Sequence, residues 1–388
     1  MRQTDQPNKP EKRFFLAQKM TYMLLAVILF LYGLIAIRDF LYPIAFGFLL
    51  AYLLFPIVNW LEKKSVPRIL ANLITIIGVL SILVGGILFA YSKLQSIVTD
   101  LPALADTAVS NISDSAARIG EYFGFERSET RQIIQDQFDS FLESGGEYLQ
   151  EIFSSTASTA VTIGLLPVYI FLFLFYRTKF AYFLLKIVHP SRKKEMVAIL
   201  REISKVAGRY MGGVIIVVFI LCFINSLGLY IIGSKYSIAL GIISALFNFI
   251  PYFGTLLGGL VPLLFAFFVE NDPVLAFRVI ILFIIIQFTE NNILTPNIVG
   301  GNVKVNPFFI ITGLVGASII WGIPGMLLIV PFLAIIRIIF SHIDSMKPFA
   351  YLLGQEGTSK HSITVQKITD LWPKAKSIFS RKKDKQKK

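Results

Sequence analysis

The sequence predicts an all-α integral membrane protein with about eight transmembrane helices, some broken or re-entrant, and an extracytoplasmic helical hairpin. Hydrophobic residues make up 55% of the chain and the mean hydropathy is +0.68. Charged residues make up 16%, whereas soluble proteins carry about 25%. Apolar runs of about 20 residues are long enough to cross a bilayer. The runs are continuous rather than alternating, which favours helices over a barrel.

Eight apolar runs define the candidate spans. They are residues 20–37, 40–60, 69–91, 156–176, 211–232, 237–269, 274–294 and 307–340. Lys and Arg favour the cytoplasmic side of a membrane. The arm 1–19 carries five basic residues, and the tail 341–388 carries eleven basic against four acidic residues. Both termini of a multi-pass membrane protein are therefore predicted to be cytoplasmic.

The first three spans occupy residues 20–91, and the next segment differs from them in charge. Residues 92–155 hold eleven acidic against four basic residues, so they are expected outside. Apolar residues recur at helical spacing from Leu94 to Ile112. Gly120 and Gly124 are expected to end that helix, and a second helix would complete a hairpin. A small ligand-binding domain is the alternative.

A basic segment, residues 177–209, follows the span 156–176. It holds nine basic against two acidic residues. An apolar stripe begins shortly after Pro190, which predicts an amphipathic helix at the cytoplasmic interface. An ordinary amphipathic packing helix is an equal alternative. The remaining apolar region, 210–340, is predicted to be a transport core, and the basic tail 341–388 follows it.

Two of the predicted spans, 237–269 and 307–340, are longer than a bilayer requires. Both contain residues that break helices, because proline removes a backbone donor and glycine weakens a helix. In transporters such breaks commonly mark the binding site. Two tilted, kinked helices are the alternative. The candidate breaks and pathway residues here are Pro251, Gly254, Gly258, Pro307, Gly322, Pro324, Gly325 and Pro331.

A polar cluster ends the apolar run 279–286. It consists of Gln287, Glu290, Asn291 and Asn292, followed by Pro296, Gly300 and Gly301. Glu290 lies twelve residues after Arg278, about 18 Å along a helix, which is within a hydrocarbon core about 30 Å thick.

An ionisable group at that depth is a candidate functional site. It would carry a proton, bind a cation or pair with a substrate. Asn248 adds an amide that suits a hydroxylated solute, an ion or a plain interhelical hydrogen bond. The alternative is that Glu290 caps a helix at the outer interface.

Motifs for other functions are missing from the sequence. There is no GxxxxGK[ST] for nucleotide hydrolysis, no HExxH and no GxSxG. The single cysteine, Cys222, lies in an apolar run, and CxxC metal spacing is absent. We therefore expect no catalytic residue, metal site or cofactor. The net charge of +13 is attributed to orientation in the lipid bilayer and not to nucleic acid.

Two stretches resemble the signature of the autoinducer-2 exporter family of permeases. They are "NFIPYFGTLLGGLVPLL" and the longer stretch that begins "QFTENNILTPNIVGG". The matching positions are Pro251, Gly254, Gln287, Glu290, Asn291, Pro296, Val303, Pro307, Gly322, Gly325 and Pro331. The resemblance implies a multispan, homo-oligomeric transporter. Family members are described as exporters of autoinducer-2 or as sodium(lithium)/proton antiporters.

Three functions remain open at this point. The first is a secondary exporter of a small polar solute such as the quorum-sensing signal autoinducer-2, coupled to an ion gradient. The second is a sodium(lithium)/proton antiporter. The third is a membrane scaffold that does not transport and that binds partners through the hairpin outside the membrane.

Overall fold

The computed structural model describes residues 9–123, 132, 140, 156–251, 253–299 and 304–355. Within these ranges the regular elements are helices, apart from an isolated bridge between Val305 and Gly354. Helices long and apolar enough to cross a membrane number seven in the described part of the chain. The predicted fold class, an all-α multi-pass membrane protein, is confirmed.

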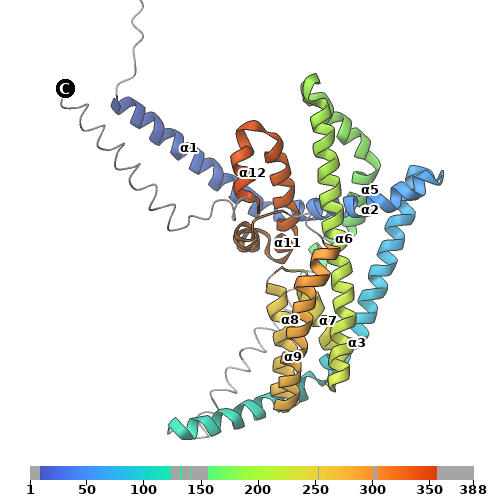
Figure 1. Cartoon of the computed structure of the whole chain (residues 1–388), viewed down its shortest axis with the longest axis vertical. Coiled ribbons are helices and arrows are strands. Elements are labelled where there is room, and N and C mark those ends of the chain that lie inside the picture. The colour runs from blue at the N-terminus through green and yellow to red at the C-terminus, as the bar shows by residue number, and fades with distance from the viewer. Residues whose placement is uncertain are drawn as a thin grey trace, which may run out of the picture.

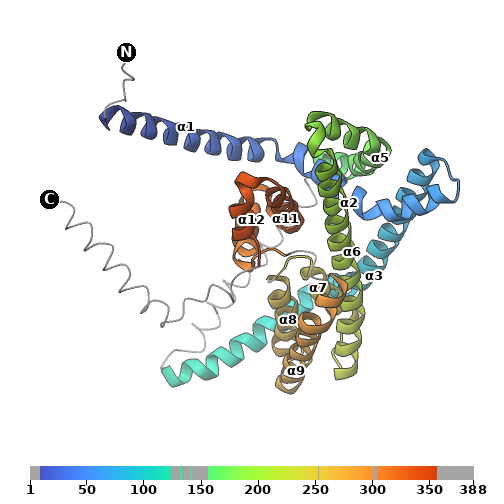
Figure 2. The same ribbon diagram turned by 45° about the horizontal axis from the view of Figure 1, so that its top comes forward.

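The first three helices are α1 (Lys9–Ala36), α2 (Arg38–Lys63) and α3 (Arg68–Phe123). Figures 1 and 2 show α1 as an arm that projects from the body of the molecule. None of the apolar span of α1 is buried inside the protein. α2 instead packs on later helices through the buried residues Leu49, Leu54 and Val58.

The helix α3 does not end where its apolar run ends. It is continuous over 56 residues and passes through Gly120, so residue 91 is no helix boundary and Gly120 is no helix break. Glycine costs a helix about 1 kcal/mol relative to alanine, which neighbouring turns readily offset. In Figure 1 the teal end of α3 runs beneath α8 (Phe253–Leu264) and α9 (Pro273–Thr289). The second helix of the predicted hairpin lies outside the described residues.

The basic segment is also part of longer helices. α5 spans Thr156–Ile187, a short 3₁₀ turn spans Pro190–Arg192, and α6 spans Lys193–Ile232. The predicted amphipathic helix is therefore the first half of α6 and not a separate element. Its apolar stripe, which includes Ile203 and Val206, packs against α2 and α11 (Pro307–His342), as the alternative of an ordinary packing helix expected.

The predicted span 237–269 is a helical hairpin. α7 (Ser237–Phe247) and α8 (Phe253–Leu264) are separate helices, and a π-helical turn, η2 (Phe265–Val269), follows α8. α7 measures 11 residues, about 16 Å, which is half of the hydrocarbon core. A Cβ built at Gly258 would lie 2.7 Å from the Ser244 carbonyl oxygen, so the two helices touch through their backbones.

After α9 (Pro273–Thr289), a π-helical turn η3 (Glu290–Leu294) and α10 (Thr295–Ile298), a second hairpin forms. α11 (Pro307–His342) reverses at Gly322, where φ is 63° and ψ is −141°. The side chains of Ile329 and Leu333 lie within about 3 Å of a Cβ built at Gly313, so the two arms lie against each other. α12 (Lys347–Leu353) then packs on α11 (Figure 1).

A side chain at Gly322 should destabilise the protein, because the dihedral angles of this residue lie in a region that L-residues avoid. We expect Gly322→Ala to cost about 1–3 kcal/mol of stability. Gly316→Ala on the same helix is the matched control, since both positions have open space for a Cβ but only Gly322 has a positive φ. Thermal unfolding in detergent measures the difference, and equal melting temperatures for the two variants would contradict the strained turn.

Candidate functional site

The two hairpins pack against opposite halves of α6. Tyr210 and the residues before it contact α11. Beyond it, Val217 and Leu221 cluster with Ala245 of α7 and Ile286 of α9, and Leu229 clusters further along with Leu240 and Val279. The helix α6 is thus a common wall, and the region where its two halves meet lies beside the end of α7.

Glu290 lies in this region, at the first residue of the π turn that interrupts α9 and α10. Its side chain belongs to the protein interior, with 7% of the residue exposed. Among the described residues, its hydrogen-bond donor is Gln287, whose Nε2 lies 3.1 Å from Oε2. π turns inside α-helices occur frequently at functional sites. The turn here begins at Glu290, whose buried carboxylate lies between the apolar contacts of Ile286 and Leu294.

Other buried polar atoms near α6 and α7 lack a hydrogen-bond partner among the described residues. They are Oδ1 of Asn225, Oγ of Ser244 and Oδ1 of Asn248. Asn225 and Ser244 are 1% and 0% exposed. An orphaned buried acceptor costs about 1–3 kcal/mol. Such a set is expected where a ligand or water supplies the missing partner.

Asn225 continues the stripe of α6 that faces α7 and α9. Leu221 and Leu229, one turn before and after it, both contact these helices. Sequence reasoning missed Asn225 and Ser244, because each is a single polar residue within an apolar run. The signal available was the helical spacing of Asn225 with its apolar neighbours.

The structure brings together some of the predicted site residues and separates others. Gln287 and Glu290 are hydrogen bonded. Asn291 and Asn292 are exposed, and Asn292 donates to the backbone oxygen of Phe288 at 2.8 Å. Their role in transport stays a prediction, as does that of the exposed Pro296.

The predicted helix breaks fall at distinct places. Pro251 lies in the turn between α7 and α8, and a Cβ built at Gly254 would lie 2.7 Å from Cα of Asn248. Pro307 begins α11, where the Asn306 side chain accepts a hydrogen bond from the Phe308 N–H at 3.1 Å. Pro324 and the buried Gly325 and Pro331 lie in the second arm of α11. Gly300 and Gly301 lie outside the described residues.

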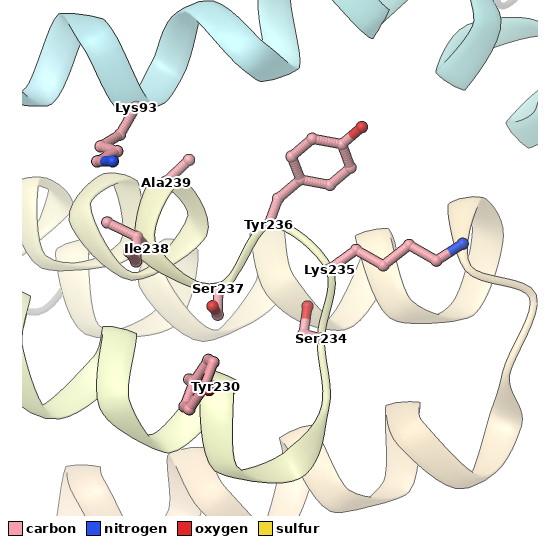
Figure 3. Close-up of a pocket in the computed structure, with 8 residues that line it drawn as sticks. All are labelled: Lys93, Tyr230, Ser234, Lys235, Tyr236, Ser237, Ile238 and Ala239. Carbon is pink, nitrogen blue, oxygen red and sulfur yellow. The ribbon is translucent and has the colours of Figure 1, made fainter.

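The turn between α6 and α7, residues 233–236, is anchored to other elements. The Tyr236 hydroxyl donates to Asp100 of α3 at 2.6 Å, and the Ser234 hydroxyl donates to Glu270 at 2.9 Å. Lys93, from α3, and Lys235 line a cavity of about 350 Å³ beside this turn (Figure 3). Asn111 of α3 also donates to the Phe268 backbone oxygen at 2.8 Å. The extended end of α3 therefore holds both outer ends of the α7–α8 hairpin.

The Tyr236 contact should be lost at alkaline pH. The hydrogen bond to Asp100 raises the pKa of Tyr236, with burial and the nearby charges adding to the effect. The contribution of this hydrogen bond to folding stability is then fully present below the tyrosine pKa of the unfolded chain, about 10. It falls as the pH rises through the higher pKa of the folded protein. In melting curves at successive pH values, Tyr236→Phe should lack this alkaline step. An equal fall in melting temperature at alkaline pH in wild type and in Tyr236→Phe would contradict the assignment of this step to Tyr236.

Comparison with known proteins adds the following. A family model described as "AI-2E family transporter" matches residues 24–345. YrrI of Bacillus subtilis strain 168 is 28% identical over 81% of this chain and 89% of its own length. YueF of the same organism is 27% identical over 85% of this chain and 89% of its own length. A protein of Borreliella burgdorferi is 24% identical over 90% of this chain and 93% of its own length.

Each of these three relatives is named as a transport protein, a role that has been inferred for it. The family match covers both hairpins and the whole of α2 to α11. A transporter family also agrees with the site, in which helix breaks surround buried polar groups. This chain belongs to the AI-2E transporter family and is a multi-pass membrane protein.

Proposed function

We propose that the protein is a secondary transporter that exports a small polar solute such as autoinducer-2, coupled to an ion gradient through Glu290. The observation that carries the proposal is the buried Glu290 carboxylate with its single described donor, Gln287. A charged carboxylate at the centre of a membrane helix costs about 2.5–3.5 kcal/mol or more. It is favourable only with a proton or a cation, so it suits a group that exchanges the two.

The two hairpins support the following arrangement of the helices in the membrane. If the basic N-terminal arm is cytoplasmic, α1, α2, α3, α5 and α6 cross in turn, and α6 ends outside. The α7–α8 hairpin then enters and leaves from the outside, α9 crosses inward, and the α11 hairpin enters from the cytoplasm. Both termini are then cytoplasmic, in the plasma membrane of a bacterium. We also propose a homo-oligomer. The apolar span of α1 is exposed and offers a surface for contact with another subunit.

Cargo would bind between α6 and the α7–α8 hairpin. Oxygens of Asn225, Ser244 and Asn248 that lack partners are suited to hydroxyl donors of a small polar solute. The Glu290 carboxylate beside a helix break also suits a dehydrated cation, because oxygens freed at broken helices coordinate Na⁺ in transporters. That observation favours a sodium(lithium)/proton antiporter as the second candidate.

Purified protein in liposomes that contain a pH-sensitive dye separates the candidates. With a proton gradient imposed, the exporter predicts proton release from the liposomes when autoinducer-2 is added, and no response to Na⁺ or Li⁺. The antiporter predicts the reverse. A folded protein that responds to neither solute would contradict both candidates and favour the scaffold.

A further inference from the structure

A larger cavity lies elsewhere, between α2, α5, α6 and α11. Its volume is about 720 Å³ and it shares no lining residue with the Glu290 site. That volume is within the range of about 300–1,000 Å³ of ligand pockets in proteins. The walls are largely apolar, and five phenylalanines contribute to them: Phe48, Phe55, Phe173, Phe180 and Phe183.

One charged side chain, that of Arg177, lines this cavity. Its guanidinium donates to the Glu62 carboxylate and, at 2.9 Å, to the Leu174 backbone oxygen. It also lies 5.2 Å from the ring centre of Phe55. The side chain is therefore fixed at the wall by contacts with three residues and does not extend into water.

The charge around Arg177 is not balanced. Arg68 of α3 pairs with the same Glu62, with its Nε 3.4 Å from the carboxylate. Two guanidinium groups thus share one carboxylate, which leaves a surplus of one positive charge. A planar guanidinium has five donors, and it matches phosphate oxygens better than any other cationic side chain.

The residues beyond Arg177 on α5 are typical of a membrane interface. Lys179 lies over the ring of Tyr176 at 5.7 Å, and Lys186 lies over the ring of Tyr182 at 5.0 Å. Aromatic and basic residues together mark the level of lipid head groups. On this pattern, the Arg177 side of the cavity is expected at the level of the bilayer phosphates.

We propose that this cavity binds an anionic phospholipid, with an acyl chain among the phenylalanines and the phosphate against Arg177. Basic pockets between transmembrane helices bind anionic head groups in this way. The surplus positive charge selects an anionic lipid over a zwitterionic one. Because Ile203 of α6 and Ile339 of α11 also line the cavity, the bound chain would join the α11 hairpin to α2 and α5.

The test uses the full chain in liposomes that contain phosphatidylglycerol with a photoreactive group in its acyl chain. Phosphatidylcholine with the same group is the comparison lipid. After illumination, mass spectrometry locates the labelled peptides. Labelling of residues 173–184 should be about fivefold higher with phosphatidylglycerol. This factor corresponds to the attraction of one basic side chain to an anionic lipid, about 1 kcal/mol.

Two variants separate the cavity from its charge. Ala181→Trp fills the cavity without touching the ion pair, and it should abolish the enriched labelling. Arg177→Gln leaves Glu62 paired with Arg68 and should remove the preference for phosphatidylglycerol. Lys186→Gln is the matched control on α5, because Lys186 does not line the cavity, and it should label as wild type does.

If Arg177→Gln fails to fold, the result with Ala181→Trp decides alone. Equal labelling by the two lipids would overturn the proposal. So would labelling spread evenly over exposed helices such as α1, or enrichment that persists in Ala181→Trp.

Discussion

Replacing Glu290 by glutamine should abolish gradient-driven transport in liposomes while the protein remains folded. Glutamine has the same shape and can still hydrogen bond with Gln287, so the π turn of η3 is preserved. It cannot bind or release a proton and gives a cation no charge to pair with. The pH-sensitive dye should then show no response to the cargo that moves protons in wild type.

The control for this prediction is Asp106→Asn, which neutralises an exposed carboxylate of α3. It removes the same charge outside the site, so its dye response should match that of wild type. Thermal unfolding in detergent should show that Glu290→Gln is at least as stable as wild type, since a buried carboxylate is replaced by a neutral group. A wild-type dye response from Glu290→Gln would remove Glu290 from the coupling step.

Gly254→Ala should have the second large effect, on the α7–α8 hairpin. A Cβ at this position would overlap the backbone carbonyl of Phe247 and lie 2.7 Å from Cα of Asn248. These are backbone atoms and cannot move aside as a side-chain end can. Overpacking of this kind costs about 1–3 kcal/mol, occasionally more, and it would displace Asn248 from the site.

The matched control is Gly85→Ala, because a Cβ at Gly85 of α3 meets nothing within 4 Å. Alanine is the better helix former by about 1 kcal/mol, so this variant should be as stable as wild type or more so. Melting temperature and dye response are measured for both variants. Gly254→Ala with wild-type values in both measurements would mean that the hairpin does not pack as described.

The sequence predicted the fold class well because hydrophobicity and charge act over whole segments. It predicted helix ends poorly where an apolar run stops but the helix does not. α3 continues past residue 91 and α6 begins at Lys193, before its apolar half, since helical hydrogen bonding does not depend on whether side chains face lipid or water. Gly254, Gly258 and Gly322 lie in the two hairpins, where each is required by a close approach or a positive φ.

The candidate site was predicted in part. Glu290 and Gln287 could be found because a carboxylate in an apolar run is conspicuous. Asn225 and Ser244 could not, because their significance depends on their burial where α6 packs against the α7–α8 hairpin and α9, and that packing is visible only in the fold. Conversely, Asn291 and Asn292 are next to Glu290 in sequence, but the π turn directs them to the exposed face.

The central claim is that Glu290 exchanges a proton for cargo, and proton release on binding tests it most directly. Purified protein in weakly buffered detergent solution would receive autoinducer-2, Na⁺ or Li⁺ while the pH is recorded. We predict that wild type releases protons with one of these solutes and that Glu290→Gln releases none. Equal release from both proteins, with Asp106→Asn as the further control, would contradict the claim.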